Sequence, residues 1–242
     1  MNIAVAGSTG LIGSQLKSLA ENAGHEVTGL SREAGIDLLK PDGLAEMLEG
    51  IDVVVDVTQS PTLEEKEASA FFETVAKNLG QAATAAGVGR TLVLSIVGAD
   101  KSPDYGYYVA KVVQEETTRA AAPNPVVLRA TQFHEFAGQM LDWNREGDTS
   151  SIIDVPLQPV ASREIAQLLL ELATAEKVVD TELAGPQAER LPDLSERVAA
   201  RRDDEIVVKA VPGPESMAGG SMLPDSSAVI RGPRWQDWFE EN

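Results

Sequence analysis

Short apolar runs alternate with longer amphipathic stretches along the first 130 or so residues. The apolar runs are rich in valine, isoleucine and leucine, and they predict buried strands at 3–6, 26–30, 52–56, 91–95 and 126–129. The stretches between them space apolar residues like one face of an α-helix, at 11–22, 42–48, 63–86 and 107–121. Such alternation is typical of repeated βαβ units and predicts an α/β fold with a doubly wound parallel sheet.

The rhythm changes beyond Arg129. Two further helices and a late strand are predicted at 133–143, 162–173 and 206–211. We expect a single domain over 1–242, in which about 130–242 forms a small C-terminal elaboration that contributes the substrate pocket. The segment 212–224 mixes proline, glycine, serine and methionine without periodicity, and it is either a surface loop or a lid over a pocket.

Composition narrows the choice of partners. Hydrophobic residues make up 43% and charged residues 24% of the chain, as in ordinary globular proteins. The net charge of −18 repels phosphate backbones and anionic bilayers, so we expect neither nucleic acid nor a membrane as a partner. Cysteine is absent and histidine is scarce, so no metal site is expected. No signal segment or membrane-spanning run is recognisable, which favours a cytoplasmic protein.

Three glycines, Gly7, Gly10 and Gly13, follow the first predicted strand and open the first predicted helix. In this context they predict a dinucleotide site, with a tight turn, close approach of the backbone to a pyrophosphate, and close helix–strand packing. The helix N-terminus faces the phosphates, and the expected contacts are Gly7, Ser8, Thr9, Gly10, Leu11, Ile12 and Gly13. The alternative is a turn that binds nothing. A Walker A loop is excluded because Ser14, not lysine, follows Gly13.

The end of the second predicted strand bears on the choice of nucleotide. An acidic residue there would hydrogen-bond the adenosine ribose of NAD, but the strand ends in Leu30-Ser31-Arg32. Arg32 offers a planar cationic fork for a 2′-phosphate and Ser31 offers a hydroxyl, so the sequence favours NADP over NAD as cofactor. The alternative is that Arg32 lies in solvent and pairs with Glu33 or with nothing.

Four sequence motifs follow one another along the chain in an order that indicates a family. They are the glycine turn, Val53-Val54-Val55-Asp56-Val57, Leu92-Val93-Leu94-Ser95 and Tyr107-Tyr108-Val109-Ala110-Lys111. In this order they resemble atypical or extended short-chain dehydrogenase/reductases, and more closely the NmrA-like NAD(P)H-binding proteins. The resemblance covers about the first 135 residues and implies a Rossmann-type sheet.

Tyr107 and Lys111 lie four residues apart on a predicted helix, so their side chains share one face. In the reductases that this motif resembles, the lysine lowers the tyrosine pKa and holds the nicotinamide ribose, while the tyrosine donates a proton to a carbonyl. Ser95 is expected to hydrogen-bond the same carbonyl oxygen. Extended relatives often carry that hydroxyl one or two positions later, where this chain has Ile96 and Val97. The alternative is an ordinary half-buried tyrosine beside a solvated lysine.

Strand ends supply further candidate cofactor contacts, because ligands of doubly wound sheets bind outside the carboxyl ends of the strands. Asp37, after a short strand that would be the third, is expected at the adenine. Thr58 and Gln59 follow the strand 52–56, where family relatives pass the nicotinamide half of the cofactor. Each of these residues is otherwise a polar loop residue.

Phe133 and His134 follow the last strand of the alternating region, where family relatives build the substrate pocket, and with Tyr108 they are the substrate candidates. His134 is an acid, a base or a substrate contact, or else a satisfied structural histidine. Tyr108 lies about 100° around the helix from Tyr107 and is either a packing residue or a substrate contact.

The chain has no GxSxG elbow and no cluster of metal ligands, which disfavours a hydrolase or a metalloenzyme. Two functions remain. One is an NAD(P)H-dependent oxidoreductase that reduces a small carbonyl or quinone-like substrate with tyrosine as general acid. The other is an NmrA-like sensor that binds NADP(H) without turnover, which a missing hydroxyl would favour. The helices 63–86 and 107–121 either pair two chains into a homodimer or cover the sheet of a monomer.

Overall fold

The computed structural model describes residues 1–202 and 205–242, which form two compact units. The first unit comprises Met1–Ile96, Tyr105–Arg129 and Arg163–Thr181. The second comprises Val97–Asp104, Ala130–Ser162 and Glu182–Asn242. Within the described residues, no helix combines the length and the apolar character needed to cross a bilayer. The single-domain organisation stays a prediction.

The first unit carries the predicted alternation of strands and helices. Its strands are β1 (Asn2–Ala6), β2 (Glu26–Leu30), β3 (Val53–Asp56), β4 (Arg90–Ile96) and β5 (Pro125–Ala130). Its helices are α1 (Leu11–Asn22), α2 (Leu44–Met47), α3 (Glu65–Ala85), α4 (Gly106–Ala121) and α6 (Ser162–Thr174). The strands and helices that were predicted here with residue bounds are confirmed, with ends shifted by a few residues, whereas the short strand expected before Asp37 is absent from the described residues.

The main sheet has seven strands in the order β12-β9-β5-β4-β3-β1-β2, with β9 at Thr181–Ala184 and β12 at Val229–Ile230. Parallel pairing puts Ile3 of β1 opposite Val27 on one side and Val53 on the other. This confirms the doubly wound, Rossmann-type α/β fold. The strand order reverses between β1 and β3. The loops that follow the carboxyl ends of β1 and β3 therefore border the crevice where such sheets bind ligands.

The short strand expected before Asp37 is wrong. After β2 the chain forms turns over residues 31–35, with Ala34 N–H donating to Ser31 O and Gly35 N–H donating to Arg32 O. Gly35 has a φ of +80°, which extended strands do not adopt. The glycine therefore ends any extended run before Asp37.

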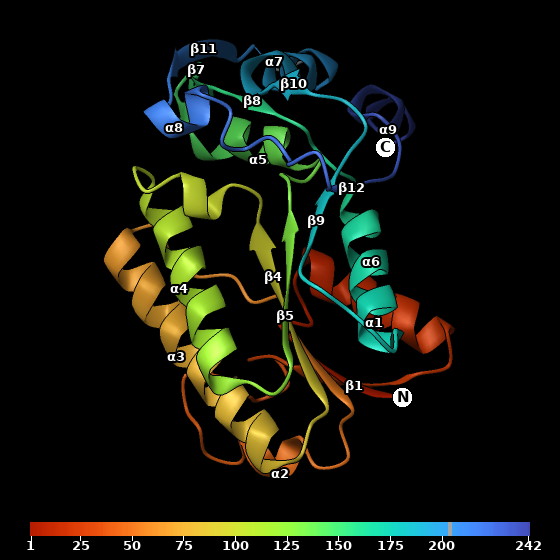
Figure 1. Cartoon of the computed structure of the whole chain (residues 1–242). Helices are drawn as coiled ribbons and strands as arrows, with labels where there is room; N and C mark the ends of the chain where they lie inside the picture. The colour runs from red at the N-terminus through yellow and green to blue at the C-terminus, as the bar shows by residue number, and fades with distance from the viewer. Residues whose placement is uncertain (203–204) are drawn as a thin grey trace. The chain divides into compact units, whose positions relative to one another are not determined.

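The strands of the first unit are covered on both faces. Figure 1 shows α3 and α4 on one face and α1 and α6 on the other. The β1 run Ile3, Ala4, Val5 and Ala6 is fully buried, and Val54 and Val55 of β3 are equally inaccessible. Burial on both faces explains why these strands read as continuous apolar runs rather than as alternating patterns.

The second unit contains mostly short elements. They are α5 (Phe136–Trp143), β6 (Arg145–Glu146), β7 (Thr149–Asp154), β8 (Pro156–Leu157), β10 (Glu189–Arg190), α7 (Leu191–Arg201), β11 (Val207–Pro212), α8 (Glu215–Ala218) and α9 (Trp235–Glu241). They form a three-stranded sheet β11-β7-β6 and a pair β10-β8. The predicted helix 133–143 and late strand 206–211 correspond to α5 and β11. Helix α7 and strand β7 were not predicted, and neither were the two-residue strands, which are too short to carry a periodic signal.

The segment 212–224 is held by hydrogen bonds inside the second unit. The N–H and hydroxyl of Ser216 both donate to the carboxylate of Asp104, and the hydroxyls of Ser102 and Ser221 lie 2.7 Å apart. A Cβ on Gly98 would lie 1.8 Å from Ser221 O, so the two backbones touch. These contacts favour an ordered surface segment over a free lid.

Candidate functional site

The glycine turn has the geometry of a phosphate cradle. Gly7 adopts a φ of +82°, which L side chains rarely adopt, and Gly10 N–H donates to Gly7 O at 3.1 Å to close the turn. A Cβ on Gly13 would lie 2.1 Å from Gly7 O, and a Cβ on Gly7 would lie 2.9 Å from Val57 O. Side chains are therefore excluded at Gly7 and Gly13, and the turn abuts the chain that leaves β3.

The helix that follows this turn suits an anion. Helix α1 begins at Leu11, has Gly10 as its N-cap and carries no acidic residue in its first turn. Its leading N–H groups and its dipole favour negative charge. Ser8 is buried against β2, where a Cβ on Gly29 would lie 2.7 Å from Ser8 Oγ. The residues present therefore fit a dinucleotide pyrophosphate, which the backbone of Gly7, Ser8, Thr9, Gly10, Leu11, Ile12 and Gly13 would hold.

The two residues after β2 differ in their surroundings. Ser31 is buried, and its Oγ accepts a hydrogen bond from Ala34 N–H at 3.3 Å. Arg32 is exposed, and its side chain makes no hydrogen bond or ion pair within residues 1–202 and 205–242. The pair with Glu33 is therefore not seen, and a solvent-exposed Arg32 without a partner among the described residues agrees with the alternative as well as with a free phosphate-binding group. A guanidinium without internal partners is available to a phosphate.

The other candidate cofactor residues are engaged locally. The carboxylate of Asp37 accepts a hydrogen bond from Leu39 N–H at 3.2 Å and pairs with Lys40 at 3.3 Å. Thr58 donates to the carboxylate of Asp56 through its N–H at 2.9 Å and its hydroxyl at 2.7 Å. Gln59 is exposed beside it. The chain leaving β3 is thus shaped by Asp56.

Helix α4 places Tyr107 and Lys111 on the side that packs against α3. The Tyr107 ring contacts Phe72 of α3 edge-on, with ring centroids 5.9 Å apart. Burial, and to a lesser extent Tyr105, raises the pKa of Tyr107 to about 12. The resemblance implied a lowered tyrosine pKa; the structure gives the opposite direction, because desolvation outweighs any attraction to the ammonium.

Lys111 is not a solvated lysine. Only 4% of it is exposed, and its Nζ donates to Leu94 O of β4 at 2.8 Å and to Gln114 Oε1. The ammonium also lies 4.7 Å from the centroid of the Phe72 ring. Burial lowers the Lys111 pKa to about 8, against attraction by Asp56 and Glu115. The lysine is therefore built into the interior of the first unit.

Ser95 is the penultimate residue of β4 and has a hydroxyl without a hydrogen-bond partner in the described chain. The residue is 2% exposed, and its Oγ has no hydrogen-bond partner in the described chain. No hydrogen bond links Ser95, Tyr107 and Lys111 to one another in that part of the chain. A buried orphan hydroxyl costs free energy, which makes Ser95 a group that a bound carbonyl oxygen would satisfy. Ile96 and Val97 offer no alternative hydroxyl.

Tyr108 is a packing residue in this structure. It is 5% exposed, and its ring contacts Tyr105 at 5.3 Å. It lies on the buried side of α4. A substrate contact through Tyr108 stays a prediction.

His134 and Phe133 belong to the second unit. His134 is 1% exposed, its Nε2 donates to Pro233 O at 3.2 Å, and burial lowers its pKa to about 4. Its ring lies 5.1 Å from that of Trp238, and the indole of Trp235 donates to His134 O at 2.9 Å. A neutral histidine that holds α9 by these contacts agrees with the structural alternative. Nδ1 is left as an acceptor without a partner among the described residues.

Sequence reasoning missed two buried polar residues of the first unit, Gln114 on α4 and Asp56 at the end of β3. Gln114 donates to Asp56 at 2.8 Å and accepts from Lys111. The available signals were a carboxylate at the end of an otherwise apolar strand and an amide three residues after Lys111, on the same helix face.

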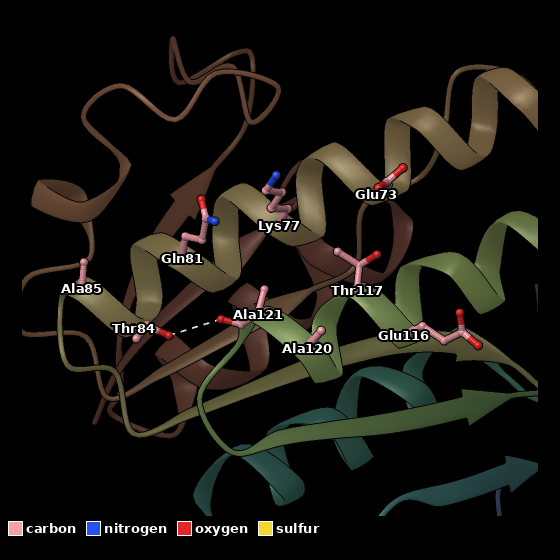
Figure 2. Close-up of a pocket in the computed structure, with 9 residues that line it drawn as sticks. All are labelled: Glu73, Lys77, Gln81, Thr84, Ala85, Glu116, Thr117, Ala120 and Ala121. Carbon is pink, nitrogen blue, oxygen red and sulfur yellow. Dashed lines mark hydrogen bonds between the residues drawn. The ribbon is translucent and has the colours of Figure 1, made fainter.

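A groove of about 720 Å³ lies elsewhere, between the outer sides of α3 and α4. Figure 2 shows Lys77 and Gln81 projecting from α3, and Thr117 from α4. Thr84 donates to Ala121 O across its end at 3.3 Å. None of the predicted site residues lines this groove.

A protein-family model, the NAD dependent epimerase/dehydratase family, matches residues 3–131, which is more than half of the chain. The chain belongs to this family. The matched region contains the glycine turn, Ser95 and the Tyr107–Lys111 pair. No curated protein matches the sequence closely enough to add a relative.

Solved structures confirm the fold over the whole chain. A dTDP-4-dehydrorhamnose reductase from Clostridium acetobutylicum superposes with a TM-score of 0.78 at 14% identity, covering 100% of this chain and 98% of that one. The Bacillus anthracis enzyme of the same name, in complex with NADP, gives 0.74 at 12% identity, covering 99% and 97%. An NADPH-dependent quinone oxidoreductase from Escherichia coli, complexed with NADPH, gives 0.70 at 17% identity, covering 93% and 92%.

Proposed function

We propose that this protein is an NADP(H)-dependent reductase of a small carbonyl or quinone-like substrate. The observation that carries the proposal is the phosphate cradle of Gly7, Gly10 and Gly13 followed by Arg32, whose guanidinium has no partner in the described residues. The cradle fits the pyrophosphate, and Arg32 fits the extra phosphate of NADP. Neighbours named as a dehydrorhamnose reductase and a quinone oxidoreductase support the substrate class.

The acid–base chemistry falls to Tyr107, Ser95 and Lys111. The bound nicotinamide would supply a hydride to the carbonyl carbon, and Tyr107 would donate its proton to the carbonyl oxygen. At neutral pH Tyr107 is protonated with its ordinary pKa of 10 and also with the raised pKa of about 12, so the proton is present, although burial makes Tyr107 a weaker acid. Ser95 Oγ would hydrogen-bond the same oxygen, and Lys111 would hold the nicotinamide ribose.

One observation favours the second candidate, an NmrA-like sensor that binds NADP(H) without turnover. Lys111 already has internal partners, and no hydrogen bond joins Lys111, Tyr107 and Ser95 in the described chain. A nucleotide-binding protein without catalysis needs no such link. The enzyme and the sensor share the cradle and Arg32, and they differ only in whether hydride transfer occurs once the nucleotide is bound.

The first test is calorimetric titration of the purified protein with NADPH, NADP, NADH and NAD. Binding of the phosphorylated pair in preference to NADH and NAD supports the nucleotide site. If none of the four binds, both candidate functions are wrong. Redox-dependent affinity without consumption of NADPH on any carbonyl or quinone supports the sensor.

The second test separates chemistry from binding. Tyr107→Phe should lower the turnover of NADPH about 10²- to 10⁴-fold while leaving NADPH affinity nearly unchanged. Tyr105→Phe is the matched control from the same segment and should retain turnover. Equal turnover in both variants would remove Tyr107 from the mechanism.

A further inference from the structure

A chain of polar side chains runs through the buried interior of the first unit. Lys111 donates to Gln114 Oε1, and Gln114 Nε2 donates to Asp56 Oδ2 at 2.8 Å. The other carboxylate oxygen of Asp56 accepts both donors of Thr58. Lys111, Gln114 and Asp56 are respectively 4%, 0% and 2% exposed. Burying so many polar groups is costly unless each is paired, and here the chain pairs them.

The Lys111 ammonium on one side and the Asp56 carboxylate on the other fix the orientation of the Gln114 amide. An ionised carboxylate only accepts hydrogen bonds and an ammonium only donates them. The amide between them therefore satisfies both with its NH₂ toward Asp56 and its oxygen toward Lys111. The reverse orientation would set donor against donor and acceptor against acceptor. This pairing is strongest while Asp56 is negative and Lys111 is positive, because each hydrogen bond of the amide then has a charged partner.

Asp56 is the carboxylate left to balance Lys111. Glu115, one turn further along α4, forms a two-point ion pair with Arg129 at 2.8 and 2.9 Å, so its charge is already matched. From β4 Lys111 faces the carbonyl of Leu94, and from α3 it faces the ring of Phe72, neither of which titrates. Tyr107, one turn earlier, is neutral below its pKa of about 12.

We propose that Asp56 and Gln114 are positioning residues that keep Lys111 charged and hold its ammonium against β4, one residue before Ser95. The carboxylate acts through the amide, since Gln114 spans the gap between them. Thr58 anchors the far side of Asp56, so the chain leaving β3 and the lysine share one network. The consequence for nucleotide binding rests on the proposed function, in which Lys111 holds the ribose.

The test measures the protonation of Lys111 directly in the nucleotide-free protein. Side-chain NMR of protein labelled with ¹³C and ¹⁵N in lysine gives a titration curve for each ammonium, and the signal missing from Lys111→Met identifies Lys111. Asp56→Asn keeps the shape and removes the charge. Gln114→Met keeps the length and removes the amide. Asp52 directly precedes β3, and Asp56 ends it. Asp52→Asn removes an exposed carboxylate and is therefore the matched control.

Asp56→Asn and Gln114→Met should each lower the Lys111 pKa from about 8 by roughly one to three units, and Asp52→Asn should leave it unchanged. In the Gln114→Met background, Asp56→Asn should add little, because the route through the amide is already broken. Equal and additive shifts in both backgrounds would assign the effect to charge alone and overturn the role of Gln114. No shift in either single variant would overturn the whole proposal.

NADPH affinity measured against pH gives an independent readout. Affinity should fall at alkaline pH as Lys111 loses its proton. In each variant the midpoint of this fall should move to lower pH by as much as the Lys111 pKa is lowered. If wild-type protein binds no NADPH, the proposed function fails while the NMR titration still decides the network. If Asp56→Asn does not fold, as judged by circular dichroism, the comparison of Gln114→Met with wild type carries the test alone.

Discussion

The glycine turn and the tyrosine–lysine pair are both parts of the candidate site, and they are built in opposite ways. The turn is made of backbone, its shape is set by Gly7 and Gly13, and the neighbouring Arg32 has no internal partner among the described residues. The pair is made of side chains that already have partners. Tyr107 packs against Phe72, and Lys111 donates to Leu94 O and to Gln114 Oε1. A backbone site keeps its groups free for a ligand, whereas a buried side-chain site must first satisfy its own polar atoms.

The largest expected effect tests the backbone half of this comparison. Gly13→Ala places a methyl group 2.1 Å from Gly7 O, and backbone on both sides resists movement, so we expect the free energy of unfolding to fall by more than about 3 kcal/mol. NADPH binding should be lost with it. Gly10→Ala is the control, because its Cβ lies at an ordinary 3.4 Å and should cost less than about 1 kcal/mol. Denaturant unfolding checks both, and similar losses in the two variants would contradict the cradle geometry.

The next effect tests the burial of the lysine. The Lys111 pKa is lowered to about 8 from 10.5, so between these values the unfolded chain binds more protons than the folded one and stability rises with pH. Relative to Lys111→Met, wild type should gain about 3 kcal/mol from pH 8 to 10.5. Subtracting the variant's curve removes Tyr107, whose raised pKa acts in the opposite direction above about pH 10. Parallel curves would show a lysine that titrates normally.

A smaller effect concerns the free guanidinium. Arg32→Ala should weaken NADPH binding about 10- to 100-fold and leave NADH binding nearly unchanged, since a hydrogen bond to a charged group contributes roughly 1.5–3 kcal/mol. Lys17→Ala removes an equal charge from the exposed side of α1 and is the control for general electrostatics. Equal losses for NADPH and NADH would assign Arg32 to a different part of the nucleotide.

The smallest effect concerns the orphan hydroxyl. Ser95→Ala should change the free energy of unfolding by less than about 0.5 kcal/mol or raise it, because the Oγ of Ser95 has no partner to lose in the described chain. Ser150→Ala should cost about 1 kcal/mol, since the equally buried Ser150 donates to Leu141 O at 2.9 Å. Turnover of NADPH should nevertheless fall in Ser95→Ala. A marked loss of stability in that variant would mean that Ser95 has a structural partner.

The sequence predicted the first unit well and the second poorly, and the reason is physical. Strands such as 53–56 are buried on both faces, and helices such as α1 end at local signals, so the information lies in neighbouring residues. The missing third strand was a local error at Gly35. Two-residue strands such as β8 and β10 exist only because segments far apart in the sequence meet, and no periodicity marks them.

By itself the sequence determined the alternation of strands and helices and the glycine turn. It also determined which residues could bind a nucleotide and which could donate a proton. These depend on backbone conformation and on spacing along one element. Only the tertiary structure decided that Lys111 is buried, that Tyr107 has a raised pKa and that Asp56 lies across Gln114 from the lysine. Protonation and partner choice depend on desolvation and on groups brought from other elements, and a linear pattern carries neither.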